Sequence, residues 1–151
     1  MLLEVSRVSD VGALPPVAWS FIRDVERLSG CIPNVSELRT LETDRRYSAV
    51  VSDQLGPFKL SVPVEIEVES VDEPRRLSAV VTGTDRRGQA RINGTLSADI
   101  EPLDSGTRIA LSMRMEILGK LATLGASPIR RRADEIFSRF AKCIQVELGA
   151  S

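Results

Sequence analysis

The chain has 151 residues, of which 42% are apolar and 27% charged, and its 20 basic and 21 acidic side chains leave a formal net charge of −1. We expect one domain over residues 1–151, with an apolar core large enough to fold without disulfides or a metal ion. The balanced charge argues against nucleic-acid binding, and four phenylalanines, one tryptophan and one tyrosine are too few for base stacking.

The sequence contains no histidine. Histidine is the usual base beside serine and cysteine nucleophiles, and it is the commonest ligand at catalytic zinc and iron sites. Its absence argues against these mechanisms. We therefore expect no catalytic residue, no bound metal and no cofactor.

The two cysteines, Cys31 and Cys143, lie far apart in the sequence and belong to no C-x-x-C motif. We find no signal peptide and no apolar run long enough to span a membrane, so the sequence predicts a cytoplasmic protein with reduced thiols. Both cysteines are expected to be buried or half-buried and to pack as small hydrophobic residues.

The N-terminal part of the chain predicts a strand at about residues 2–9 and then a helix over residues 15–28. Pro15 and Pro16 suit a first helical turn, and the apolar residues after them recur at spacings of three and four. Gly30 follows this helix. We expect a short turn at residues 31–34 that leads into the next strand.

Between residues 35 and 117 apolar and polar residues alternate, which is typical of half-buried antiparallel strands. The longest run starts at Phe58 and would span roughly 40 Å, so the sheet must curve strongly to stay compact. Pro63, within this run, favours an edge or bulge position. With the N-terminal strand this pattern predicts seven strands, at about residues 2–9, 36–43, 46–53, 58–69, 76–83, 90–100 and 109–117.

A second helix is predicted over residues 128–148. Ser127 suits the N-cap and Pro128 the first turn, and an apolar stripe then continues to Leu148. A break or kink is expected near Gly125 to Pro128. The apolar face of the curved sheet is the natural place to bury this stripe, so the element order predicts an α+β fold in which the sheet grips the last helix.

The segment between the last strand and the last helix reads Gly-Lys-Leu-Ala-Thr-Leu-Gly at residues 119–125. Together with Trp19, the Cys-Ile-Pro turn at 31–33 and Leu-Gly-Pro-Phe at 55–58, it resembles the G-subunit family of carbon monoxide dehydrogenase. That family belongs to the helix-grip, START-like (SRPBCC) superfamily. The resemblance covers nearly the whole chain in the right order.

This resemblance implies a bacterial, non-enzymatic accessory protein. Members of the family are linked to molybdenum hydroxylases of the carbon monoxide dehydrogenase type, which they are thought to help recruit to the membrane. The superfamily binds apolar ligands between the sheet and the last helix. The resemblance thus implies a quinone-type or lipid-type ligand, a molybdenum hydroxylase partner and a location in the cytoplasm, peripheral at the inner face of the membrane.

Candidate ligand-binding residues lie in the apolar rows predicted to face the last helix and in the helical end of the chain. A long curved sheet under one helix leaves a concave space that aliphatic side chains fill poorly, although each residue alone could be ordinary core. The methionines could adapt to a ligand or fill gaps. The candidates are Leu60, Val62, Val64, Ile92, Leu96, Leu111, Met113, Met115, Leu121, Leu124, Phe137 and Phe140.

Candidate docking residues lie where the last strand passes into the last helix. Two glycines within seven residues suggest a backbone that bends or approaches another surface closely. The arginine triplet behind them is either a solvated helix face or a contact for anionic lipid or an acidic partner surface. The candidates are Gly119, Lys120, Gly125, Arg130, Arg131 and Arg132.

Among the carboxylates, Asp53 continues a row that starts at Tyr47, which places it either at the end of the pocket or in a strand-end or turn role. The three glutamates at positions 65, 67 and 69 share the opposite face and are expected in solvent. Two alternative functions stay open, a polyketide cyclase or aromatase-like enzyme of the same fold and a small-molecule sensor or chaperone. The scarcity of inward polar residues favours binding over catalysis.

Overall fold

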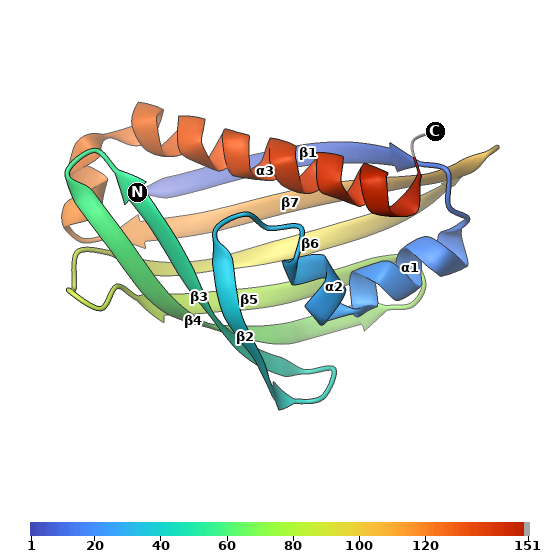
Figure 1. The fold of residues 1–151 in the computed structure, drawn as a ribbon, viewed down its shortest axis with the longest axis horizontal. Helices are drawn as coiled ribbons and strands as arrows, with labels where there is room; N and C mark the ends of the chain where they lie inside the picture. Colours follow the sequence, from blue (N-terminus) through green and yellow to red (C-terminus); the bar gives the residue numbers. More distant parts are fainter. Residues whose placement is uncertain (150–151) are drawn as a thin grey trace.

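The computed structural model describes residues 1–149, which form one seven-stranded antiparallel sheet and a long C-terminal helix (Figure 1). The strands lie in the order β1-β7-β6-β5-β4-β3-β2, so that the first strand of the chain pairs with the last. The elements are β1 (Leu2–Val11), α1 (Pro15–Arg23), α2 (Val25–Ser29), β2 (Val35–Glu42), β3 (Arg46–Leu55), β4 (Phe58–Asp72), β5 (Arg76–Thr84), β6 (Arg91–Leu103), β7 (Gly106–Leu118), the 3-10 helix η1 (Lys120–Leu124) and α3 (Ala126–Leu148).

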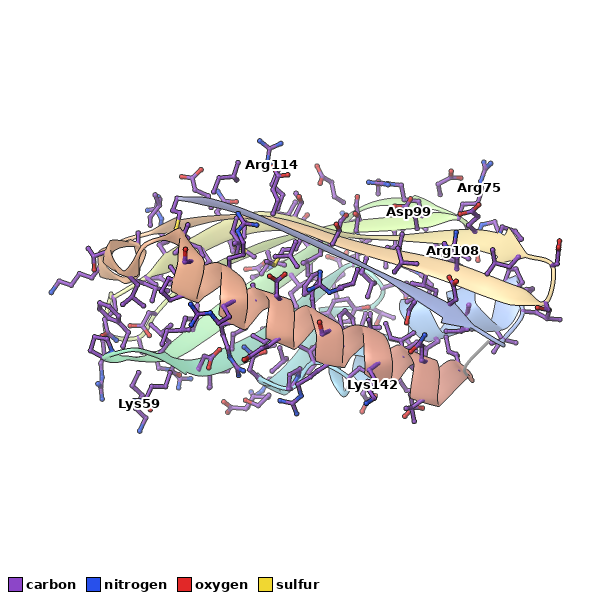
Figure 2. All side chains as sticks on the ribbon, turned by 90° about the horizontal axis from the view of Figure 1, so that it is seen from above. Lys59, Arg75, Asp99, Arg108, Arg114 and Lys142 are labelled. Carbon is purple, nitrogen blue, oxygen red and sulfur yellow. A yellow bond between two sulfur atoms is a disulfide. The ribbon has the colours of Figure 1, made fainter. Side chains whose placement is uncertain are left out.

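The predicted α+β helix-grip fold is confirmed. Helix α3 runs along one face of the sheet beside β1, and the buried Ser9 hydroxyl of β1 donates a hydrogen bond of 2.6 Å to the Ala141 carbonyl of α3. Seen from above, labelled charged side chains such as Asp99 and Arg114 point away from α3 (Figure 2). The sheet therefore has an apolar inner face, which α3 covers, and a polar outer face.

Two residues mark where the sheet bends or changes its pairing. A Cβ atom at Gly94 would collide with the Arg114 carbonyl oxygen and the Met115 backbone, so β6 and β7 approach too closely there for a side chain. Pro63 pairs with Val50 of β3, whereas pairing with β5 begins only at the next residue, Val64. Pro63 therefore lies at a locally unpaired edge, where its missing N–H costs no ladder hydrogen bond, as predicted.

The helix predicted over residues 15–28 is wrong in one respect, because it is two helices. Asp24 leaves the helical region, with φ −85° and ψ 86°, and its side chain accepts a hydrogen bond from the Arg27 N–H at the start of α2. The apolar spacing continues across this break, which is why periodicity alone predicts a single helix. Helix α3 begins at Ala126, two residues before the predicted start at 128. Gly125, with φ 85°, makes the expected break, and Ser127 lies inside the helix instead of capping it.

The expectation of two reduced thiols is also wrong, because Cys31 and Cys143 form a disulfide. They are 112 positions apart in the sequence, but the turn after α2 brings Cys31 against α3 with a Cα–Cα distance of 5.4 Å. Two backbone hydrogen bonds, from Gly12 to Gly149 and from Ala13 to Leu148, hold the same end of α3. The C-terminal half of α3 is therefore fixed to the rest of the domain.

Candidate functional site

The register of the sheet places all the candidate strand residues on the inner face. Met115 pairs with Leu3, which lies in the same row of β1 as Ser9, and Ile92 of β6 and Val64 of β4 both pair with Gly83 of β5. Phe137 and Phe140 face the sheet from α3 and contact each other edge to face, with ring centroids 6.2 Å apart. The period-two and helical patterns therefore bring these residues to one interior.

This interior is not packed equally throughout. Beside α1, Phe21, Ile22, Ile109 and Ile144 are at most 1% exposed. Ile92, Leu96 and Met113 are only partly buried, although β6 and β7 pair with strands on both sides. Ile92 and Leu96 have paired strands on both sides and point to the inner face, so their exposed part lies on that face, whereas Met113 also borders a hollow on the outer face. The other strand and helix candidates are buried, namely Leu60, Val62, Val64, Leu111, Met115, Leu121, Phe137 and Phe140.

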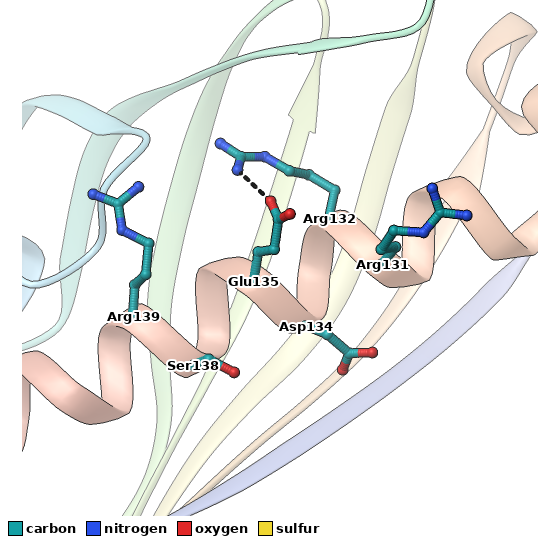
Figure 3. A pocket seen from close by; sticks show the side chains of 6 residues that line it. All are labelled: Arg131, Arg132, Asp134, Glu135, Ser138 and Arg139. Carbon is teal, nitrogen blue, oxygen red and sulfur yellow. Dashed lines mark hydrogen bonds and ion pairs between the residues drawn. The ribbon is translucent and has the colours of Figure 1, made fainter.

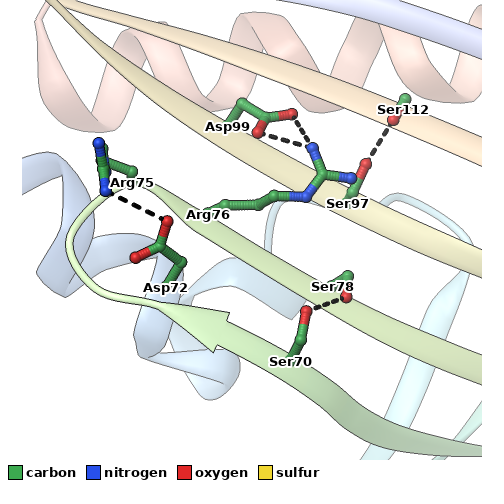
Figure 4. A network of polar contacts seen from close by, with 8 residues as sticks. All are labelled: Ser70, Asp72, Arg75, Arg76, Ser78, Ser97, Asp99 and Ser112. Carbon is green, nitrogen blue, oxygen red and sulfur yellow. Dashed lines mark hydrogen bonds and ion pairs between the residues drawn. The ribbon is translucent and has the colours of Figure 1, made fainter.

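Two hollows of about 500 and 510 Å³ lie outside this interior. The first is on the outer side of α3, where Figure 3 shows its lining side chains, including Arg131 and Arg139. The second is on the outer face of the sheet, beside the Ser97–Ser112 hydrogen bond and the Arg76–Asp99 ion pair drawn in Figure 4. Neither hollow is formed by the apolar rows, although Met113 borders the second.

Asp53 lies on the inner face of β3 and is held by α3. Arg132 Nε donates a hydrogen bond of 2.8 Å to Asp53 Oδ2, and its Nη1 donates one of 2.8 Å to Glu135. These bonds, first the one to Asp53, raise the pKa of the Arg132 guanidinium. With side-chain exposures of 14% for Asp53 and 28% for Arg132, this is the most buried ion pair in the described part of the chain. Asp53 thus ties the end of the interior to α3.

The structure separates the three candidate arginines. Arg130 Nη1 donates a hydrogen bond of 3.0 Å to the Glu4 carbonyl on β1, which is an edge strand. Such a contact occupies a backbone carbonyl that could otherwise accept a hydrogen bond from a strand of another molecule. Arg132 is bound to Asp53, whereas Arg131 is exposed and makes no ion pair within residues 1–149. The triplet therefore does not act as one patch.

Glycines bound the η1 segment at both ends. Gly119 has φ 97° and Gly125 has φ 85°, a region that favours glycine, so each glycine is explained by a sharp change of direction. Leu121 between them is buried, and its N–H donates a hydrogen bond of 2.9 Å to the Gln89 carbonyl. Leu124 is partly buried beside Gly56 in the β3–β4 turn. Lys120 is exposed, so η1 presents one cation to solvent while its leucines close this end of the interior.

One buried carboxylate was not anticipated. Asp85 is 3% exposed and accepts hydrogen bonds from the backbone N–H groups of Ser61, Arg87 and Gln89, at 2.9 to 3.1 Å. Burial alone would raise the pKa of Asp85. The hydrogen bonds lower this pKa by more than burial raises it, so the pKa of Asp85 lies below its ordinary value. Asp85 lies between the strands predicted at residues 76–83 and 90–100, and this turn position is the signal for such a role, because Asp often binds backbone amides in turns. Asp85 organises the β5–β6 loop against β4.

A curved antiparallel sheet closed by one long C-terminal helix defines the helix-grip, START-like class of proteins. A conserved protein from Geobacillus kaustophilus has the same fold, with 24% identity, a TM-score of 0.84 and coverage of 97% of this chain and 95% of its own. A START superfamily protein from Mycobacterium smegmatis is similar at 15% identity, with a TM-score of 0.72 and 96% coverage of both chains.

The particular family follows from the sequence profile of CoxG, the G subunit of carbon monoxide dehydrogenase, which matches residues 9–149. The chain therefore belongs to the CoxG family, and the predicted family is confirmed. No curated protein matches the chain. In the part of the chain that the structure describes, no helix is both long and apolar enough to cross a bilayer.

Proposed function

We propose that this protein is a non-enzymatic binding protein that holds an apolar molecule, of quinone or lipid type, between the sheet and α3. The observation that carries the proposal is the partial burial of Ile92, Leu96 and Met113, which face α3 from strands with neighbours on both sides. Membership of the CoxG family and the START-like fold support a role in binding hydrophobic ligands. The candidate ligand-binding residues are those of the inward apolar rows.

A binding role is favoured over acid–base catalysis by the state of Asp53. Its carboxylate faces the interior from β3, but Oδ2 accepts a hydrogen bond of 2.8 Å from Arg132 Nε. A general base must be free to accept a proton from its substrate. The remaining inward side chains of β3 between Tyr47 and Asp53 are Ala49 and Val51, which carry no acid or base.

The accessory role is the second part of the proposal. The CoxG family supports a link to a molybdenum hydroxylase of the carbon monoxide dehydrogenase type. We place the contact surface at Gly119, Lys120 and Gly125 and at the exposed Arg131, next to the end of the interior. Arg130 and Arg132 flank this surface. A peripheral location at the inner face of the membrane stays a prediction, and the disulfide disagrees with the reduced thiols expected of a cytoplasmic protein.

Filling the interior tests the proposal. Leu96→Trp adds bulk to the inner face, and Thr95→Trp adds the same bulk one residue away on the exposed outer face. The purified proteins are incubated with a total bacterial lipid extract, and bound compounds are identified by mass spectrometry after removal of excess lipid. We expect the parent and Thr95→Trp to retain an apolar compound and Leu96→Trp to retain much less. Equal retention by both variants, or none by the parent, would contradict an interior site.

A further inference from the structure

Tyr47 is a buried side chain whose polar atom is not used by the protein. The residue is 6% exposed, and within residues 1–149 its hydroxyl has no hydrogen-bond partner. In the same part of the chain no fully buried side-chain oxygen or nitrogen lacks a partner. The Tyr47 hydroxyl oxygen is therefore not fully buried and still borders open space.

The strand register fixes the direction in which Tyr47 points. Tyr47 pairs with Ile66 of β4, and the same row continues through Val81 of β5 and reaches Met115 of β7. Directly paired residues in an antiparallel sheet point to the same face. Since Met115 lies on the inner face, Tyr47 also faces the interior, in line with Asp53 on the same strand.

The other polar side chains on the inner faces of β1, β3 and β7 have partners. Arg7 binds Asp134 and Ser138 of α3, Asp53 binds Arg132, and the hydroxyl groups of Ser9 and Thr107 donate to backbone carbonyls. In these three strands Tyr47 is the inward polar group without a partner. Leaving a hydroxyl unpaired in apolar surroundings costs free energy. This position therefore favours a molecule that brings an oxygen atom to the Tyr47 hydroxyl.

We propose that the Tyr47 hydroxyl recognises the polar end of the interior ligand by a hydrogen bond to a carbonyl or hydroxyl oxygen. This inference rests on the proposed function and names the chemistry of the ligand more closely. The ligand class is an apolar molecule that carries at least one such oxygen. The apolar rows bind its hydrocarbon part, and Tyr47 discriminates it from a pure hydrocarbon.

Two fluorescent probes separate these contributions. Prodan is a naphthalene with a propionyl carbonyl, and diphenylhexatriene is a hydrocarbon without oxygen. Tyr47→Phe removes only the hydroxyl, and Ser48→Ala removes a hydroxyl from the next residue, which lies on the opposite face of β3. The dissociation constant of each probe is measured for the parent and both variants, together with the melting temperature.

We expect Tyr47→Phe to weaken Prodan binding roughly fivefold to twentyfold, because the carbonyl oxygen loses its donor. Diphenylhexatriene binding should change by less than about twofold, and Ser48→Ala should change neither. An unchanged affinity for Prodan, an equal loss for both probes, or parent protein that binds the hydrocarbon alone would overturn the role of Tyr47. Binding of neither probe by the parent would instead overturn the proposed function itself.

Discussion

Arg132 of α3 and Asp53 of β3 form the most buried ion pair of residues 1–149, and they join the final helix to a strand 79 positions earlier in the chain. The pair lies at the N-terminal half of α3, whereas the disulfide and the Ser9–Ala141 hydrogen bond hold the C-terminal half. A covalent bond thus helps to hold the C-terminal half of α3, whereas the N-terminal half is held by non-covalent contacts such as the Arg132–Asp53 pair.

The first prediction concerns this pair. Arg132→Gln should lower the free energy of unfolding by about 1–3 kcal/mol, because it leaves the mostly buried Asp53 carboxylate without its charged partner. Glu135→Gln removes the exposed partner of the same arginine and should change stability by less than about 0.5 kcal/mol. Urea denaturation measures both. Equal effects of the two substitutions would show that the Asp53 contact has no special weight.

The disulfide gives the second prediction. Closing a loop between positions 112 apart restricts the unfolded chain, so the Cys31→Ala, Cys143→Ala double variant should lose roughly 2–5 kcal/mol. Reducing agent should destabilise the parent and leave the variant unaffected. Maleimide labelling under denaturing, non-reducing conditions should modify no cysteine. Labelling of two thiols per chain would contradict the disulfide and restore the sequence-based expectation.

Asp85 gives the third prediction, which concerns pH. The pKa of Asp85 in the folded protein lies below the ordinary value of 3.8, so its contribution to stability is fully present above that value. The contribution is lost as the pH falls through the lowered pKa of the folded state. Asp85→Asn should therefore be less stable than the parent near neutral pH, by about 1–3 kcal/mol, and the difference should shrink in acid. A difference that stays constant down to the lowest pH at which both proteins fold would refute this role.

The fourth prediction concerns docking. Arg131 is exposed and unpaired in the described residues, so Arg131→Gln should leave the melting temperature nearly unchanged. We expect it to weaken co-sedimentation with vesicles of phosphatidylcholine and phosphatidylglycerol by about fivefold, and added salt should reduce the difference. Arg75→Gln removes the same charge from the β4–β5 turn and serves as the control. If both variants bind as the parent does at low salt, Arg131 does not contact the membrane.

Much of the architecture could be predicted because the alternation of apolar and polar residues along a strand shows which face of the sheet each side chain occupies. The period of two assigns Leu96 and Met113 to the inner face without any tertiary information, and the same row logic places Asp53 there. The features that escaped prediction depend on contacts between distant segments. The pairing of Cys31 with Cys143 requires the position of α2 against α3.

The chemistry of the site was harder to predict for the same reason. Tyr47 is visible in the sequence only as the start of a row, and the absence of a partner for its hydroxyl within residues 1–149 depends on everything packed around β3. The arginine triplet looks like one charged patch in the sequence. Its members separate because Arg130 reaches β1 and Arg132 reaches β3, in different directions from one helical turn.

Native mass spectrometry of the purified full chain tests the central claim most directly. The chain has a mass of 16.5 kDa, and a bound apolar molecule adds its own mass to the folded protein. We predict a folded species heavier than the bare chain, either as isolated or after incubation with bacterial lipid extract, that returns to the bare mass on denaturation and releases an oxygen-containing apolar compound. A folded protein that keeps the bare mass under both conditions would contradict the account.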